Sequence, residues 1–125
     1  MSDAVFSAEA PPPAGHYSQA IRAGDFLFVS GQVPRRSDGS YQPSDVASET
    51  RQVLDNLAAI AQAAGADLDR AVKITAYLAD GGYFAEFNLA YAEYFGSIPP
   101  ARTTVVAGLR QVKVELDAII HLPPG

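Results

Sequence analysis

The chain has 125 residues, 48% hydrophobic and 18% charged, which is enough for one folded domain over residues 1–125 and too short for two. Its formal net charge of −5 at pH 7 argues against non-specific nucleic-acid binding, because that binding depends on basic residues that neutralise phosphates. The lack of cysteine excludes disulfides and thiolate catalysis. Two histidines without the spacing of metal ligands predict no metal site.

Residues 1–14 are small, acidic and rich in proline, so we expect an extended or flexible lead-in. This stretch lacks the basic and apolar regions of a signal peptide, and the chain has no run of eighteen apolar residues. A soluble, cytoplasmic protein is therefore predicted.

Two strands are predicted next, over residues 17–23 and 26–30, with a turn between them. The second strand is apolar on both faces, so both of its sides must be covered. Its apolar side chains are Phe26 and Phe28 on one face and Leu27 and Val29 on the other.

A loop is predicted over residues 31–43, where Arg35 and Arg36 are interpreted as solvated side chains. Ser44 is the expected N-cap of a helix that ends at Gly65. Apolar residues recur along it at helical spacing, so one face of the helix should pack on the sheet, and Glu49 should lie on the exposed face.

Alternating residues over 72–78 predict a third strand, and a second amphipathic helix is expected over residues 83–95. Its aromatic stripe is interpreted as core rather than as a ligand platform. The stripe contains Phe84, Phe87, Tyr91, Tyr94 and Phe95.

The last forty residues contain two further predicted strands, over residues 102–107 and 112–120, joined by a short turn as a hairpin. Arg102 begins the first strand and Glu115 lies on the returning strand, so the hairpin would bring a cation and a carboxylate together. Two interpretations remain open. The pair is an exposed cross-strand ion pair, worth less than ~1 kcal/mol, or it belongs to a binding site.

Three motifs in this order resemble the Rid/YjgF family, the reactive-intermediate (enamine/imine) deaminases. The first is Tyr17-Ser18-Gln19-Ala20, the second is Ser30-Gly31-Gln32-Val33-Pro34, and the third joins Pro100-Ala101-Arg102 to Val114-Glu115. Together they cover nearly the whole chain. One departure is Thr104, which stands where the best-known members have a cysteine.

The order of elements predicts a two-layer α+β fold, with a mixed sheet and both helices on one face. The uncovered apolar face of the sheet predicts self-association. The resemblance implies a chorismate-mutase-like (YjgF-like) fold, assembled as a homotrimer with clefts between subunits.

The resemblance also implies a reaction, the hydrolytic deamination of small 2-imino or 2-enamino carboxylates to 2-oxo acids and ammonia without a cofactor. Arg102 would bind the carboxylate, as its five-donor guanidinium allows, and Glu115 would orient or deprotonate water. Tyr17 and Ser30 of an adjoining subunit would bond the nitrogen and its water. Backbone amides near Gly31 and Thr104 would help hold the carboxylate, and Asn88 resembles a cleft-facing residue.

A second hypothesis uses the same arginine without catalysis, in a trimer that binds or senses small carboxylates. Capture needs Arg102 alone, whereas turnover also needs an acidic group that holds water, so Glu115 favours the enzyme. Ribonuclease action is disfavoured by the negative charge and the lack of a histidine pair.

Overall fold

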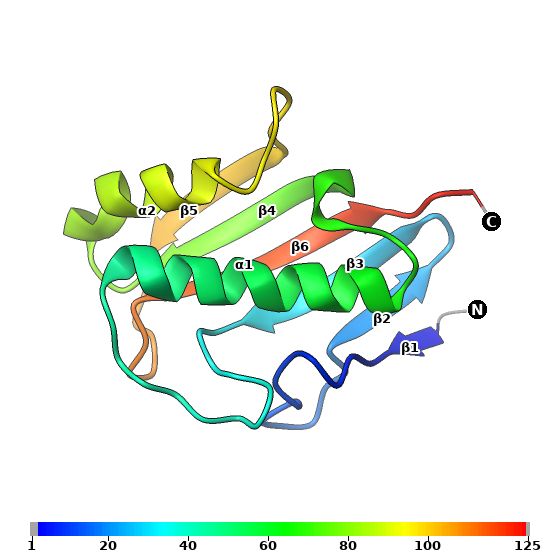
Figure 1. Cartoon of the computed structure of the whole chain (residues 1–125), viewed down its shortest axis with the longest axis horizontal. Helices are drawn as coiled ribbons and strands as arrows, with labels where there is room; N and C mark the ends of the chain where they lie inside the picture. Colours follow the sequence, from blue (N-terminus) through cyan, green and yellow to red (C-terminus); the bar gives the residue numbers. More distant parts are fainter. Residues whose placement is uncertain (1–2, 125) are drawn as a thin grey trace.

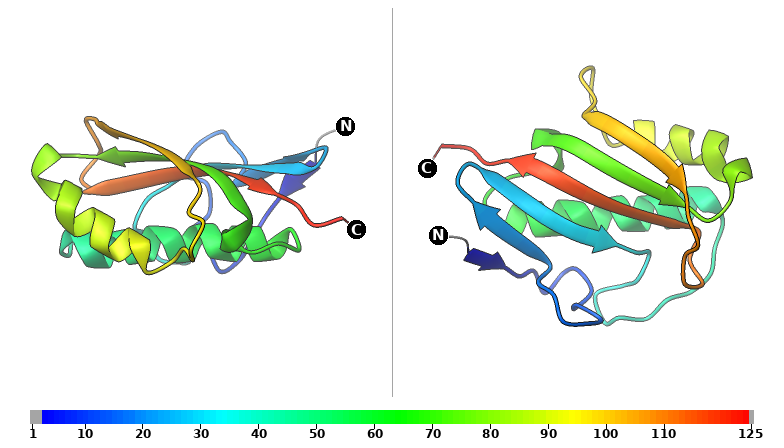
Figure 2. Two further views of the ribbon diagram at one scale, coloured as in Figure 1. Left: turned by 90° about the horizontal axis from the view of Figure 1, so that it is seen from above. Right: turned by 180° about the vertical axis from the view of Figure 1, so that it is seen from behind.

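The computed structural model describes residues 3–124, which form one mixed β-sheet with two helices packed on one of its faces (Figures 1 and 2). The strands are β1 (Asp3–Val5), β2 (Ala20–Ala23), β3 (Phe26–Gln32), β4 (Ala71–Leu78), β5 (Ala101–Val106) and β6 (Val114–His121). The helices are α1 (Val46–Ala63) and α2 (Phe84–Ala92), with short 3-10 turns η1 (Leu68–Arg70) and η2 (Gly81–Tyr83). The predicted α+β class, with both helices on one face, is confirmed.

The strand order is β1-β2-β3-β6-β4-β5, and among these described strands β4 and β5 are the one neighbouring pair that runs parallel. The predicted hairpin is therefore wrong, because β6 lies between β3 and β4 while β5 lies on the far side of β4. The connection passes over the end of β4, where Ala107 N donates to Leu78 O and Ala79 N donates to Lys113 O. Strand β4 thus separates the two strands that carry the predicted site.

Helix α1 begins one residue later than predicted, because Asp45 and not Ser44 is its N-cap. The Asp45 carboxylate accepts from Ser48 N at 2.7 Å, and the helix ends before Gly65, whose φ of 81° suits glycine. The expected exposure of Glu49 is also wrong, since only 2% of it is accessible. The buried stripe that packs on the sheet contains Val46, Val53, Leu54, Leu57, Ile60 and Ala61.

Helix α2 is shorter than the predicted 83–95, because the 3-10 turn η2 precedes it and it ends at Ala92. The Asp80 carboxylate caps η2 by accepting from Gly82 N at 2.7 Å. Phe87 and Tyr91 lie in the core as predicted, whereas Phe84 is exposed at the edge of the molecule.

No helix within residues 3–124 covers the second face of the sheet, which we call the open face (Figure 2). As predicted, β3 is apolar on both sides, with Leu27 and Val29 buried beneath the helices and Phe26 and Phe28 exposed on the open face. Neither helix in residues 3–124 combines the length and hydropathy needed to cross a bilayer.

The lead-in contains strand β1, which the sequence did not indicate and which pairs antiparallel with β2. Residues 1 and 2 of the predicted lead-in lie outside the described residues. Buried Gln19 orders the rest of it, since its Oε1 accepts from Ser7 N and its Nε2 donates to Ser7 O and Pro11 O. The lead-in therefore packs against β2 and places residues 12–14 beside Tyr17.

Candidate active site

A pocket of about 940 Å³ lies beside the start of β6, and we call it the Glu115 pocket. The end of β3, the lead-in and the two loops over residues 33–39 and 108–112 form its walls. Its lining includes Pro12, Pro13, Ala14, Tyr17, Ser30, Gly31, Val33, Arg35, Gly39, Gly108, Leu109, Arg110, Gln111, Val112 and Glu115. Four predicted site residues, Tyr17, Ser30, Gly31 and Glu115, thus share one pocket.

Glu115 is the acidic group of this pocket. Burial, followed by the nearby negative charge of Asp117, raises the pKa of its carboxyl above the ordinary value. Asp117 itself accepts from Tyr77 Oη at 3.0 Å, which makes it a partner within the sheet. Gly31 lies directly against Glu115, and a Cβ at this position would overlap the Glu115 carboxyl. Glycine at position 31 therefore lets the carboxyl lie against β3.

Tyr17 and Ser30 present different hydrogen-bonding capacities to the pocket. Tyr17 Oη accepts from Ala14 N at 3.1 Å, so its own proton is available to a ligand. Ser30 Oγ donates to Ser18 O at 2.7 Å, so its proton is committed while its oxygen still accepts. The pair can therefore hold a water or an amino group by donating from one side and accepting from the other.

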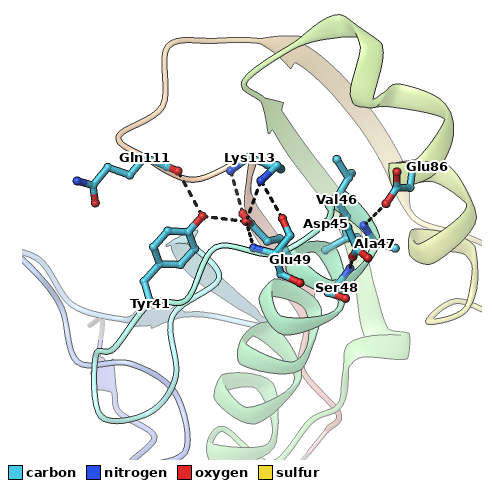
Figure 3. A network of polar contacts seen from close by, with 11 residues as sticks. Tyr41, Asp45, Val46, Ala47, Ser48, Glu49, Glu86, Gln111 and Lys113 are labelled. Atoms are coloured by element: carbon cyan, nitrogen blue, oxygen red, sulfur yellow. Dashed lines mark hydrogen bonds and ion pairs between the residues drawn. The ribbon is translucent and has the colours of Figure 1, made fainter.

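Buried Glu49 fixes the loops that border this pocket (Figure 3). Its Oε2 accepts from Tyr41 Oη at 2.8 Å and from Ser44 N at 3.1 Å, and its Oε1 accepts from Lys113 N at 2.9 Å. Lys113 Nζ lies 3.5 Å from Oε2 and supplies the opposite charge. Burial, with the hydrogen bond to Glu49, raises the pKa of Tyr41 to about 12. One carboxylate thus joins to α1 the segments that directly follow both pocket loops.

Arg102 lies in a different environment, between β5 and α2. Its Nη2 donates to Asn88 Oδ1 at 2.8 Å, and its Cζ lies 5.8, 5.3 and 4.7 Å from the ring centroids of Phe84, Phe87 and Tyr91. These contacts orient the guanidinium and leave most of its five N–H donors unused. The Tyr91 hydroxyl beside it is buried and has no hydrogen-bond partner among residues 3–124. We call this arrangement the Arg102 edge.

Arg102 and Glu115 lie on opposite faces of the sheet. Arg102 is paired in register with Ile74, and Thr104 with Ala76, both buried beneath the helices. Glu115 is paired with Tyr77, whose side chain reaches Asp117 on the open face. The structure therefore brings Arg102, Thr104 and Asn88 to one side and the Glu115 pocket to the other. The interpretation of Arg102 and Glu115 as a cross-strand ion pair is wrong.

The other polar clusters in the described residues are weaker candidates for a binding or catalytic site. A second hollow of about 440 Å³ contains Arg70 and His121, but Arg70 Nε already donates to His121 O at 2.8 Å. Within the described range, no three histidine or acidic side chains come together in a way that could hold a metal ion.

Comparison with known proteins identifies the family of this chain. The sequence profile described as Endoribonuclease L-PSP matches residues 7–122. The chain belongs to this family, the Rid/YjgF proteins. A RutC family protein of Pyrococcus horikoshii is 46% identical over 97% of this chain and 98% of its own length.

Solved Rid/YjgF structures agree closely with this fold. Yeast Mmf1 has a TM-score of 0.94 at 34% identity and covers 98% of this chain and 100% of its own. The Rid family protein YyfA of Yersinia pestis has a TM-score of 0.92 at 35% identity, with 98% and 100% coverage. TdcF of E. coli, solved with bound serine, has a TM-score of 0.89 at 30% identity, with 97% and 99% coverage. The resemblance drawn from the three motifs is confirmed.

Proposed function

We propose that this protein hydrolyses small 2-imino and 2-enamino carboxylates to 2-oxo acids and ammonia, in clefts between the copies of a homotrimer. Each cleft would combine the Arg102 edge of one copy with the Glu115 pocket of another. The single observation that carries the proposal is the Glu115 carboxyl, which lies in a pocket with Tyr17 and Ser30 and has a raised pKa. A carboxyl in such surroundings is suited to proton transfer.

Two observations support a site shared between copies. Arg102 and Glu115 face opposite sides of one sheet, so a single chain offers no place where a small molecule meets both. The open face also exposes Phe26 and Phe28, which would be buried if copies packed together there.

The chemistry needs few groups. Water adds to the electrophilic carbon of the C=NH₂⁺ group while Glu115 accepts one of its protons. The proton is returned to the nitrogen, the C–N bond breaks, and the products are a C=O group and ammonium. Arg102 would hold the carboxylate through paired hydrogen bonds, which contribute about 1.5 to 3 kcal/mol. The side chain of Asn88 and the backbone near Gly31 and Thr104 would complete the binding.

Tyr17 and Ser30 would form hydrogen bonds with the attacking water and the departing nitrogen. The free Tyr17 proton can be donated to the attacking water, and the Ser30 oxygen can accept from the N–H group. The serine bound by TdcF is an amino acid with the same carboxylate and amino groups, which supports this class of ligand. The same observation favours an alternative, in which the trimer binds small carboxylates without turning them over.

Turnover can be measured on 2-aminoacrylate produced by a serine dehydratase and trapped with semicarbazide. We expect the protein to reduce the trapped adduct and to speed pyruvate formation. Arg102→Ala should abolish both effects, and Arg36→Ala should retain them because Arg36 is exposed and lies outside the pocket. Equal activity of wild type and Arg102→Ala would refute the assignment. Binding of 2-oxobutanoate without any turnover would establish the non-catalytic alternative.

A further inference from the structure

The Glu115 pocket contains two cationic side chains that the proposed reaction does not use. Arg35 comes from the loop after β3 and Arg110 from the loop before β6, and both line the pocket together with Glu115. Two of its three charged lining residues are therefore cationic, although the chain as a whole carries a net charge of −5. Arg36 is exposed, as expected for a solvated loop residue, whereas Arg35 is half-buried in this wall and Arg110 is exposed.

The Arg35 guanidinium is held in place by its own loop. Its Nη1 donates to Gly39 O at 3.1 Å, and its Cζ lies 5.7 Å from the ring centroid of Tyr41. Tyr41 is itself anchored on buried Glu49. The guanidinium is thus oriented at a modest entropic cost, and most of its donors remain available.

Among residues 3–124, no carboxylate forms a salt bridge with either guanidinium. The salt bridges among residues 3–124 join Arg51 to Glu93 and Lys113 to Glu49, and neither involves Arg35 or Arg110. Cations without a salt-bridge partner on the wall of one pocket favour an anionic ligand, because each attracts it and no internal ion pair has to be broken first.

We propose that the Glu115 pocket selects substrates with a second negative charge, namely 2-imino or 2-enamino dicarboxylates, whose side-chain carboxylate binds Arg35 and Arg110. This inference rests on the proposed function, in which Arg102 of a second copy binds the carboxylate next to the imine. The two anionic groups then lie at opposite ends of the molecule, and the imine carbon lies between them, near Glu115. The pocket volume of about 940 Å³ leaves room for such a side chain.

The test compares acidic with neutral imines. Amino-acid oxidases with oxygen and catalase generate imines from aspartate, glutamate, alanine and 2-aminobutyrate, and semicarbazide competes for them. The measured quantity is the ratio of kcat/KM for acidic to neutral imines in wild type, Arg35→Gln, Arg110→Gln and Arg36→Gln. Arg36→Gln is the matched control, because it removes the same charge one residue away, on an exposed side chain outside the pocket.

We expect wild type to favour the acidic imines. Arg35→Gln and Arg110→Gln should each lower the ratio by about tenfold or more, as expected for a lost charged hydrogen bond, with neutral turnover retained. Arg36→Gln should leave the ratio unchanged. Retained turnover of the neutral imines also shows that the variants fold.

Failure of the inference and failure of the proposed function are distinguishable. Turnover of neutral imines with a ratio that neither Arg35→Gln nor Arg110→Gln changes would overturn the inference and leave the deaminase intact. If no imine is turned over, the proposed function fails. Calorimetry with 2-oxoglutarate and 2-oxobutanoate then tests whether the pocket has a subsite for a second negative charge. Tighter binding of 2-oxoglutarate that is lost in Arg35→Gln would support the anionic subsite, and equal binding of both acids would overturn it.

Discussion

The Arg102 edge and the Glu115 pocket differ in how their charged groups are surrounded. Arg102 lies over three aromatic rings and donates to Asn88, so its position is set before any ligand arrives. Glu115 is half-buried and the largest effect on its pKa is burial, which disfavours its charged form. The Arg102 edge fixes the position of a guanidinium, whereas the Glu115 pocket contains a carboxyl whose raised pKa suits proton transfer.

In the proposed function, the two regions are complementary halves of one site. A preorganised guanidinium recognises a carboxylate but cannot move a proton at neutral pH. A carboxyl with a raised pKa can accept a proton but offers an anionic ligand no attraction. Because they lie on opposite faces of the sheet, the proposed reaction requires both halves to come from different copies.

The largest expected effect comes from Glu115→Gln, which removes the proton acceptor and preserves the shape that fits against Gly31. We expect kcat to fall on the order of 100-fold or more, as for loss of a general base. Affinity for 2-oxobutanoate, measured by calorimetry, should change little because Arg102 is intact. An unchanged kcat would remove Glu115 from the mechanism.

A smaller effect, on stability, is expected for Glu49→Gln, which separates the loops of the Glu115 pocket from α1 and leaves the Arg102 edge untouched. The amide offers one acceptor oxygen where Tyr41, Ser44 and Lys113 all donate. The free energy of unfolding, measured in urea, should fall on the order of 2 to 4 kcal/mol.

Glu86→Gln is the matched control for this change. The Glu86 carboxylate accepts one backbone N–H, that of Ala47 at 2.9 Å, and unlike Glu49 it lies on the exposed surface (Figure 3). Its loss should cost about 0.5 kcal/mol or less. Equal effects of the two substitutions would contradict the role assigned to Glu49.

The smallest expected effect concerns pH. The negative charge of Asp117 contributes to the raised pKa of Glu115, so Asp117→Asn should lower that pKa. The proposed reaction uses the carboxylate form of Glu115, so activity should rise as the pH passes upward through the Glu115 pKa. The acid limb of the kcat/KM profile should therefore move to lower pH, while the asparagine oxygen can still accept from Tyr77. Asp25→Asn, in the exposed β2–β3 turn, should leave the limb in place.

The sequence predicted the layers of the fold better than the pairing of its strands. Hydrophobic periodicity located α1, α2 and the principal strands, since burial on the helix-covered face repeats with the period of each element. Periodicity carries no information about which strands are neighbours. The assumption that successive strands pair failed for β5 and β6, because the connection between them crosses the end of β4.

The sequence indicated candidate site residues one by one, but it did not predict how they are arranged. The motifs identified Tyr17, Ser30, Gly31 and Glu115, which share a pocket, and Arg102, which lies elsewhere. Glu49 was assigned to the solvent because helical spacing alone does not show that loops fold over the start of α1. The one available signal for Arg35 and Arg110 was their position beside two motif segments. Nothing in their spacing indicated that the loops meet.

The most direct test mixes two inactive variants. Arg102→Ala and Glu115→Gln are unfolded together and refolded as a mixture, and deamination of 2-aminoacrylate is compared with each variant refolded alone. A site shared between copies predicts that activity returns to roughly a quarter of the wild-type value, the fraction of interfaces that unite an intact Arg102 with an intact Glu115. If the mixture contains both variants in one oligomer, as mass spectrometry would show, and remains as inactive as its components, the two-copy site is contradicted.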